Sequence, residues 1–208
     1  MTRSQLGRPV GASGEATRQR IIVATMRCVA RAGYSRATIR EIARTAKVTS
    51  ASLYNYFPNK SDLIKAAIAA RTDVALPRLR QAAASPGDVI DRIEAVLDES
   101  GRLMSEYPDL AAFEWAIRAE SALALDSEVA GSTGFQAFRE IIESIIEDAS
   151  HRGAVEAIYS LIYGLTELAA TLPAEDYHAA LGAAKELIKG TLFGRRGQSA
   201  SFRASSVQ

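Results

Sequence analysis

The sequence predicts an all-α protein in which a small head of three helices, residues 15–60, precedes a larger helical bundle, residues 61–193. From about residue 17 onward, apolar residues recur at steps of three and four, which is the periodicity of a helix with one buried face. Prolines, glycines and capping residues divide this pattern into separate segments. With 208 residues, 48% of them apolar, the chain is long enough for a small head and a well-buried body.

Three helices are expected in the head. The first begins near Thr17 and ends at Gly33, since glycine favours the C-terminal end of a helix. The second begins at Thr38, whose side chain is placed to accept from the backbone of Glu41 while Glu41 reaches back. Thr49 is placed to cap the third helix, which has room for only two turns before the next proline.

The body is expected to be helical throughout. Asn59 is placed to cap a long helix that links the head to the body and bends near Pro77. Further apolar stripes follow, interrupted by a loop at 131–134. The last two helices are expected over 154–172 and 174–193, with a proline at the corner between them.

The helix expected over 154–172 is apolar on two adjacent faces. Such a helix must be buried on both sides, either inside a large core or partly against a second copy of the chain. Because the body is too small to surround a helix completely, we favour a homodimer formed through the last two helices. The expected contact residues are Ile158, Leu161, Leu165, Leu168, Leu181, Ala184 and Ile188.

The two ends of the chain lack helical periodicity. Residues 1–14 are expected to form a disordered basic arm, and residues 194–208 a disordered tail. Cys28 is the single cysteine, which excludes an intramolecular disulfide and favours a reducing, cytoplasmic compartment. No stretch approaches the roughly 20 apolar residues that a membrane-spanning helix needs, so no membrane partner is expected.

The charges divide sharply between head and body. Residues 1–60 hold 11 Lys and Arg and 2 acids, a net charge of +9, whereas residues 61–208 hold 14 and 22, a net charge of −8. A basic head on an acidic body suggests that the head alone meets a polyanion. A merely solvated basic surface is the alternative, and charge alone does not separate the two.

Two short helices joined by a tight turn form a helix-turn-helix, whose second helix can enter the major groove of DNA. Over about residues 17–65 the head closely resembles the DNA-binding domain of the TetR family of regulators. The residues that carry the resemblance are Arg20-Ile21-Ile22, Gly33-Tyr34, Thr38-Ile39-Arg40-Glu41-Ile42-Ala43, Val48-Thr49, Leu53-Tyr54-Asn55-Tyr56-Phe57 and Lys60. The resemblance implies a three-helix helix-turn-helix DNA-binding domain followed by a helical-bundle ligand-binding and dimerisation domain.

This resemblance, with the physics of base contacts, implies roles for the second and third helices of the head. Thr49, Ser50, Ala51 and Ser52 start the recognition helix, where small side chains allow close approach to base edges. Arg40 matches a position that reaches a base, and a guanidinium suits the two acceptors of guanine. The alternative for Arg40 is an ordinary surface arginine.

Other head residues match positions that usually contact the phosphate backbone, which gives affinity and register but no sequence information. These residues are Thr38, Tyr54, Asn55, Tyr56 and Lys60. The alternative for the tyrosines is packing beside Phe57. In the N-terminal arm, Arg8 is expected to enter the minor groove.

The head departs from the family pattern at two positions. Lys47 stands where a turn glycine is usual, and Val29 replaces a common phenylalanine. Lysine tolerates a left-handed backbone less readily than glycine does, so a slightly strained turn is expected, with an added charge beside the DNA.

For the body, the resemblance implies a small-molecule pocket among the middle helices. The residues expected to line it are Met104, Phe113, Phe138, Ile142 and Tyr163, with ordinary core packing as the alternative for each. Arg118 would indicate an anionic ligand if it pointed inward; its alternatives are solvation or a pair with Glu114. No cofactor and no metal ligand is expected.

The sequence therefore predicts a regulator, expected to be a repressor, that binds a palindromic double-stranded DNA operator as a homodimer and is released by an unidentified small-molecule effector. The alternative is a ligand-independent DNA-binding protein whose body recruits another protein. An enzyme is not expected, because the two histidines fit no metal-ligand spacing and no glycine-rich phosphate loop is present. A sizeable cavity in the body would favour the ligand-controlled regulator over the recruiter.

Overall fold

The computed structural model of the chain describes residues 10–122, 135–146 and 153–190. Within these residues every regular element is a helix, so the predicted all-α class is confirmed. The helices are α1 (Val10–Ala32), α2 (Ile39–Thr45), α3 (Ser50–Tyr54), α4 (Lys60–Ala83), α5 (Val89–Glu106), α6 (Pro108–Ala122), α8 (Phe135–Glu143), α9 (Ala154–Thr171) and α10 (Ala174–Ile188). In this part of the chain no helix is long and apolar enough to cross a membrane.

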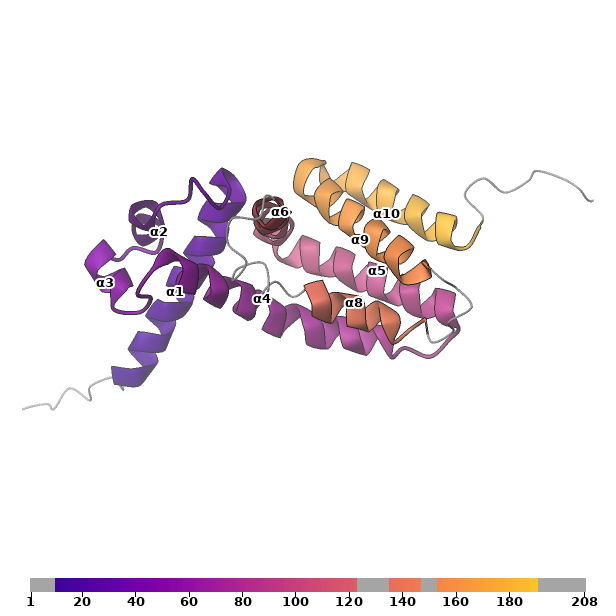
Figure 1. The fold of residues 1–208 in the computed structure, drawn as a ribbon, viewed down its shortest axis with the longest axis horizontal. Helices are drawn as coiled ribbons and strands as arrows, with labels where there is room; N and C mark the ends of the chain where they lie inside the picture. The colour runs from indigo at the N-terminus through magenta and orange to yellow at the C-terminus, as the bar shows by residue number, and fades with distance from the viewer. Residues whose placement is uncertain (1–9, 123–134, 147–152, 191–208) are drawn as a thin grey trace, which may run out of the picture.

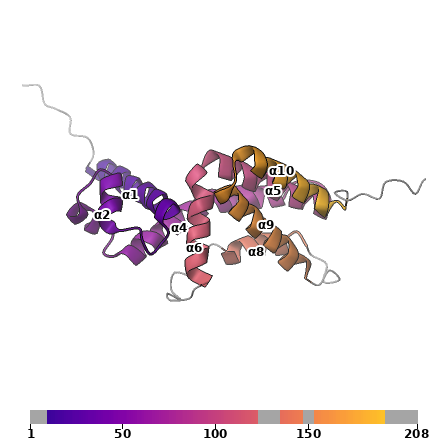
Figure 2. The ribbon, with the colours of Figure 1, turned by 90° about the horizontal axis from the view of Figure 1, so that it is seen from above.

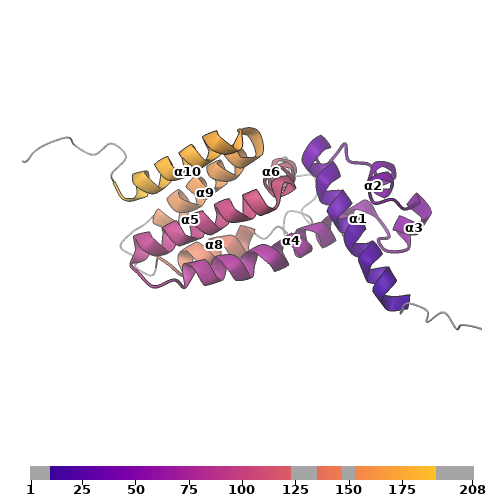
Figure 3. The same cartoon turned by 180° about the vertical axis from the view of Figure 1, so that it is seen from behind.

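The molecule is elongated, with the head at one end and the body at the other (Figure 1). Helices α1, α2 and α3 form the head, and α4 leaves the head to run along the body beneath α5 and α8. Helices α9 and α10 lie on the side of the body opposite α4, as the view from behind also shows (Figure 3). Helix α6 crosses the others where head and body meet, which is clearest from above (Figure 2).

The predicted caps set the starts of three helices. The Thr38 hydroxyl accepts the backbone N–H of Glu41 at 3.2 Å at the start of α2. The Thr49 hydroxyl accepts the N–H of Ser52 at 3.0 Å at the start of α3. The Asn59 side chain accepts the backbone N–H of Asp62 at 2.8 Å at the start of α4. Each cap satisfies a donor that the helix itself leaves without a partner.

The first helix is longer than predicted. It begins at Val10 rather than near Thr17, so part of the segment expected to be a disordered arm is helical. Residues 10–16 contain two glycines and lack an apolar stripe, so neither helix propensity nor periodicity indicated these turns. Helix α1 ends at Gly33, whose φ of +80° is easily adopted only by glycine. Arg8 and the predicted tail lie outside the described residues.

The hydrophobic core of the head does not stop at the head. Phe113 and Ile117 of α6 are buried in the same cluster as Ile21 and Val29 of α1 and Leu53 of α3. Phe113 is fully buried there, so the prediction that it lines a ligand pocket in the body is wrong. Helix α6 therefore joins the body to the head through packing, in addition to the covalent link through α4.

The body core is formed by α4, α5, α8, α9 and α10. Ile142 is fully buried within it and lines none of the described cavities, which corrects its assignment to the ligand pocket. Leu165, Leu181 and Ala184 are also buried in this core within a single chain. Because these side chains have little exposed surface left for a partner, they are left out of the dimer face proposed below.

Candidate DNA-binding surface and ligand cavities

Helices α2 and α3 form a compact helix-turn-helix. Ile42 and Ala43 of α2 and Leu53 of α3 are buried in the core of the head, which fixes the two helices by their inner faces. The turn is closed by the N–H of Val48, which donates to the Ala43 carbonyl at 3.0 Å. The opposite faces of both helices are left toward solvent.

Lys47 occupies the centre of that turn. Its φ of +58° lies in the left-handed region, and among the described residues it is the one non-glycine residue with a positive φ. The conformation that the turn requires is one that glycine adopts at no steric cost. The expected strain at this position is thus present in the backbone, and the Lys47 side chain is exposed beside the turn.

The predicted groove-facing residues lie together at the start of α3. Thr49 and Ala51 are exposed and Ser50 and Ser52 half-buried, so small side chains surround the N-terminal end of the helix. The Thr49 cap leaves other N–H groups of the first turn toward solvent, where they favour an anion or a base acceptor. This arrangement suits close approach of a backbone to DNA.

The longer polar side chains surround this surface. Tyr54 is 50% exposed and Asn55 and Thr38 are exposed, so none is needed in the core. Tyr56 is half-buried and packs against the head core, which supports the alternative interpretation for that tyrosine. Arg40 is exposed on α2.

Lys60 is engaged within the head. Its ammonium group donates to the carbonyl of Tyr34 at 2.5 Å and to that of Ser35 at 3.4 Å, and it lies 4.6 Å from the centre of the Tyr34 ring. These contacts tie the start of α4 to the turn between α1 and α2. A phosphate contact by Lys60 stays a prediction, since it would compete with them.

The outer surface of the helix-turn-helix is basic. Arg40 and Arg44 of α2 and Lys47 of the turn are all exposed. Glu41 is the single acid in the span 38–60. Arg44 was not among the predicted DNA contacts. Its position one turn after Arg40 on α2 was the available indication, because residues four apart share a helix face.

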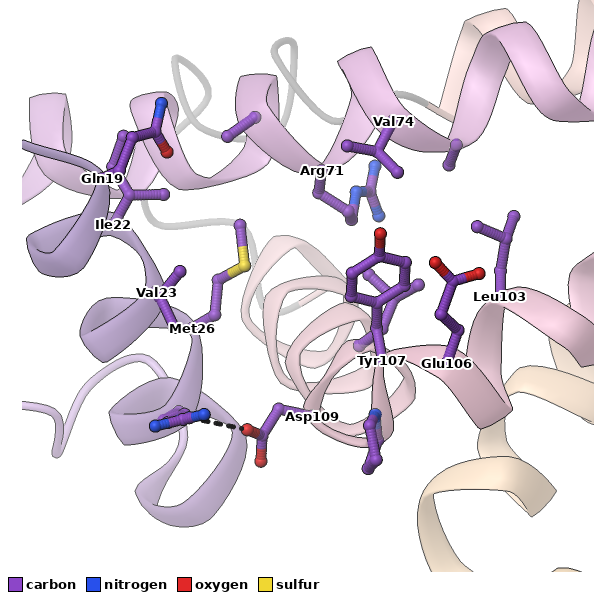
Figure 4. A pocket seen from close by; sticks show the side chains of 15 residues that line it. Gln19, Ile22, Val23, Met26, Arg71, Val74, Leu103, Glu106, Tyr107 and Asp109 are labelled. Carbon is purple, nitrogen blue, oxygen red and sulfur yellow. Dashed lines mark hydrogen bonds and ion pairs between the residues drawn. The ribbon is translucent and has the colours of Figure 1, made fainter. Parts of the chain in front are cut away.

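Two neighbouring cavities, among others in the described residues, lie in and beside the body. The larger, about 310 Å³, opens between α1, α4 and the corner where α5 meets α6 (Figure 4). The smaller, about 50 Å³, lies deeper among α4, α5, α6, α8 and α9. Arg71, Ala75, Leu103 and Leu110 line both, so the two cavities share a wall.

The predicted pocket residues are divided by the structure. Met104 and Phe138 line the smaller cavity. Tyr163 instead packs edge-on against Trp115 at 5.6 Å between ring centres and lies under the guanidinium of Arg118 at 4.5 Å. None of these residues lines the larger cavity.

A buried charged cluster stands where the two cavities meet. The Glu114 carboxylate contacts the guanidinium of Arg71 and, at 3.3 Å, that of Arg118, and all three side chains are almost fully buried. Burial, with the nearby charge of Arg118, lowers the pKa of Arg71 to about 10. Burial likewise lowers the pKa of Arg118. Arg118 thus points inward and is also paired with Glu114.

Arg71 was missed by sequence analysis. The buried stripe of α4 runs through Ile64, Ile68 and, after half-buried Ala75, Leu79, and Arg71 falls in the gap of that stripe. A charged residue in an otherwise apolar stripe indicates a buried, partnered group. That interruption was the available signal.

Within the described ranges, no group of three or more His, Cys, Asp or Glu residues is arranged to hold a metal ion. The polar side chains on the surface of the helix-turn-helix include guanidiniums, hydroxyls and amides. Such groups suit the recognition of anions and base edges.

The structure thus places an exposed helix-turn-helix on an all-helical body. Residues 21–67 match the family described as bacterial regulatory proteins, tetR family. The predicted resemblance is therefore confirmed.

Two regulators share sequence with the chain. The HTH-type transcriptional regulator SrpR of Pseudomonas putida is 39% identical over 66 residues, which are 32% of this chain and 31% of SrpR. The HTH-type transcriptional repressor KstR of Mycolicibacterium smegmatis is 29% identical over 91 residues, 44% of this chain and 45% of KstR. The chain thus matches less than half of the length of either relative.

The fold extends the similarity to the body. The transcriptional regulator FadR of Bacillus subtilis, solved in complex with stearoyl-CoA, superposes with a TM-score of 0.65 over 83% of this chain and 98% of that chain. The sequence identity is 18%, so this likeness concerns the fold alone.

Proposed function

We propose that the chain is a transcriptional repressor that binds a palindromic DNA operator as a homodimer and is released from it by a small-molecule effector. The observation that carries this proposal is the exposed N-terminal end of α3 on a basic head with a tetR-type sequence. Such a regulator acts in the cytoplasm, where the buried thiol of Cys28 stays reduced.

In the proposed complex, Thr49, Ser50, Ala51 and Ser52 face the floor of the major groove. Arg40 donates to a guanine, and the polar residues around it hold phosphates. The backbone contacts are assigned to Thr38, Tyr54, Asn55 and Tyr56, with Lys60 able to join only by leaving the Tyr34 carbonyl. Arg8 is proposed to reach the minor groove.

The proposed dimer places the outer sides of α9 and α10 against their copies. Half-buried Ile158, Leu161, Leu168 and Ile188 remain in this face after the three core residues are removed from it. Leu187 of α10 is 51% exposed and adds apolar surface that is available to a partner. A two-fold axis here would present two heads to successive turns of one face of DNA.

A cavity of about 310 Å³ favours ligand control over the recruiter alternative, because it lies within the size range of small-molecule sites. FadR of Bacillus subtilis, which has the same fold, was solved with stearoyl-CoA bound. By analogy, we propose that an effector in the body of this chain changes the position of its head.

Selection of bound duplexes from a random DNA library tests operator binding. The proposal predicts enrichment of an inverted repeat with half-sites about 10 base pairs or a multiple of it apart. Arg40→Ala should then relax the preference at one position per half-site by about 1–3 kcal/mol. Arg102→Ala, which removes an exposed arginine from α5 of the body, is the control. Uniform loss at every position would contradict base contact by Arg40.

Sedimentation equilibrium at micromolar concentration tests the dimer. The proposal predicts a dimer for the native chain and dissociation for Leu187→Glu, because two carboxylates would be placed at the two-fold contact. Val23→Glu is a matched control, since Val23 is 45% exposed but belongs to α1 of the head rather than to α9 or α10. A native monomer would overturn the dimer.

A further inference from the structure

The larger cavity has one wall from the head and the others from the body. Ile22, Val23 and Met26 of α1 form the head wall, and Val74 of α4 and Tyr107 face them from the body (Figure 4). The lining is mostly apolar. At about 310 Å³ the space has the size of a small-molecule site.

Arg71 enters this cavity from α4. Figure 4 shows its guanidinium directed toward the Tyr107 hydroxyl at the end of the cavity away from α1. The side chain is 12% exposed, and its Nε, although buried, has no hydrogen-bond partner. A buried guanidinium nitrogen without an acceptor is costly, and an incoming oxygen would remove that cost.

From this geometry we propose that the cavity between α1, α4 and the α5–α6 corner binds a small monoanionic carboxylate with one apolar group. The carboxylate accepts from Arg71, and the apolar group lies against Val74, Met26 and Ile22.

The charges around the cavity favour an anion over a cation. Glu114 is shared between Arg71 and Arg118, so Arg71 does not have that carboxylate to itself. The other acids of the lining already have arginine partners: Glu106 binds Arg78 at 2.6 Å and Asp109 binds Arg27 at 3.2 Å. Burial, and after it the nearby positive charge of Arg118, lowers the pKa of Arg71.

The site is placed to act on the head directly. A ligand within it would touch α1 and α4 at once, and the Arg27–Asp109 pair that spans from α1 to α6 lies at its edge. Filling the cavity sets the distance between α1 and the body, and so the orientation of α2 and α3. This regulatory step rests on the proposed function, whereas the binding site itself does not.

Calorimetric titration of the full-length chain tests the site with three probes of one skeleton. These are 3-phenylpropanoate, the uncharged 3-phenylpropanamide and the cationic 3-phenylpropylamine. The proposal predicts saturable binding of the carboxylate, with the amide at least about tenfold weaker because the charge-assisted hydrogen bond is lost. Equal binding of all three, or no saturable binding of the carboxylate up to 10 mM, would overturn it.

Two variants locate the binding. Arg71→Met should weaken 3-phenylpropanoate at least about tenfold while leaving the amide unchanged. Val74→Phe fills the cavity from an exposed position and should abolish binding without disturbing the core. Val89→Phe, at an equally exposed valine outside the cavity, is the control and should bind normally. Unchanged binding in Val74→Phe would place the ligand elsewhere and reject the proposal.

The failure of this site and the failure of the proposed function give different results. A chain that binds its selected operator but not 3-phenylpropanoate lacks this site and remains a regulator. A chain that binds the probe through Arg71 but enriches no DNA sequence has the site without the proposed function.

Discussion

Head and body place their charges in opposite ways. In the head the basic residues Arg40, Arg44 and Lys47 stand exposed on the outside of a small apolar core. In the body, Arg71, Glu114 and Arg118 are buried together between two cavities. Exposed charges add little to folding and are available to a polyanion, whereas buried charges are costly and indicate a specific role. The comparison points to DNA at one end and a small anion at the junction.

The largest expected effect comes from the residue that joins the two regions. Phe113→Ala should lower the free energy of unfolding by about 3–5 kcal/mol, because it leaves a cavity in a core shared by α6 and the head. Urea denaturation followed by circular dichroism measures the loss. A loss below about 1 kcal/mol would show that α6 does not hold the head to the body.

The second largest effect is expected in the buried cluster of Arg71, Glu114 and Arg118. Glu114→Gln should destabilise the chain by about 3 kcal/mol, because two buried guanidiniums lose their shared carboxylate. Glu143→Gln is the matched control, since Glu143 also pairs with an arginine four residues away but is 44% exposed. The same urea titration should detect almost no change in the control. Similar losses in both variants would contradict the special role of the buried cluster.

A smaller effect is expected at the cap of α3. Thr49→Ala should cost about 1 kcal/mol by leaving the Ser52 N–H without its partner, and Thr49→Ser should restore most of it. Thermal unfolding measures both. Thr171→Ala, at an exposed threonine in the last turn of α9, should leave the melting temperature unchanged. An equal loss of stability in Thr49→Ser and Thr49→Ala would contradict the role of the hydroxyl as the cap of α3.

The smallest expected effect is at the turn. Lys47→Gly should relieve the positive φ and change stability by no more than about 1 kcal/mol in the favourable direction, offset in part by the freedom of glycine in the unfolded chain. The same variant should weaken DNA binding and reduce its salt dependence, because an exposed charge is removed. A stability loss above about 1 kcal/mol would show that the lysine side chain, not the turn, is important.

The head was largely predictable because its structure follows local rules. Thr38, Thr49 and Asn59 each cap the helix that follows them, as their spacing predicted, and the buried positions of α2 and α3 follow the helical period. The start of α1 was the exception. Its first turns lack an apolar stripe, so periodicity could not indicate them.

The body was predictable in its helices but not in its contacts. Periodicity shows which residues of a helix are buried, but not against which neighbour. Phe113 is therefore buried in the head core, although a ligand pocket was predicted for it. Leu165 and Leu181 are buried in the core of their own chain, although contact with a partner was predicted for them. The place of Arg71 in a cavity could not be predicted from the sequence, because the cavity forms only where the fold brings α1 and α4 together.

The most direct test of the account is hydrogen exchange of the full-length chain, alone and on its selected operator. We expect the operator to slow amide exchange in residues 38–55, which include the start of α3. The exchange rates of the amides in α8 and α10 should be the same with and without DNA. Protection in the body with none in residues 38–55 would contradict the assignment of DNA binding to the head.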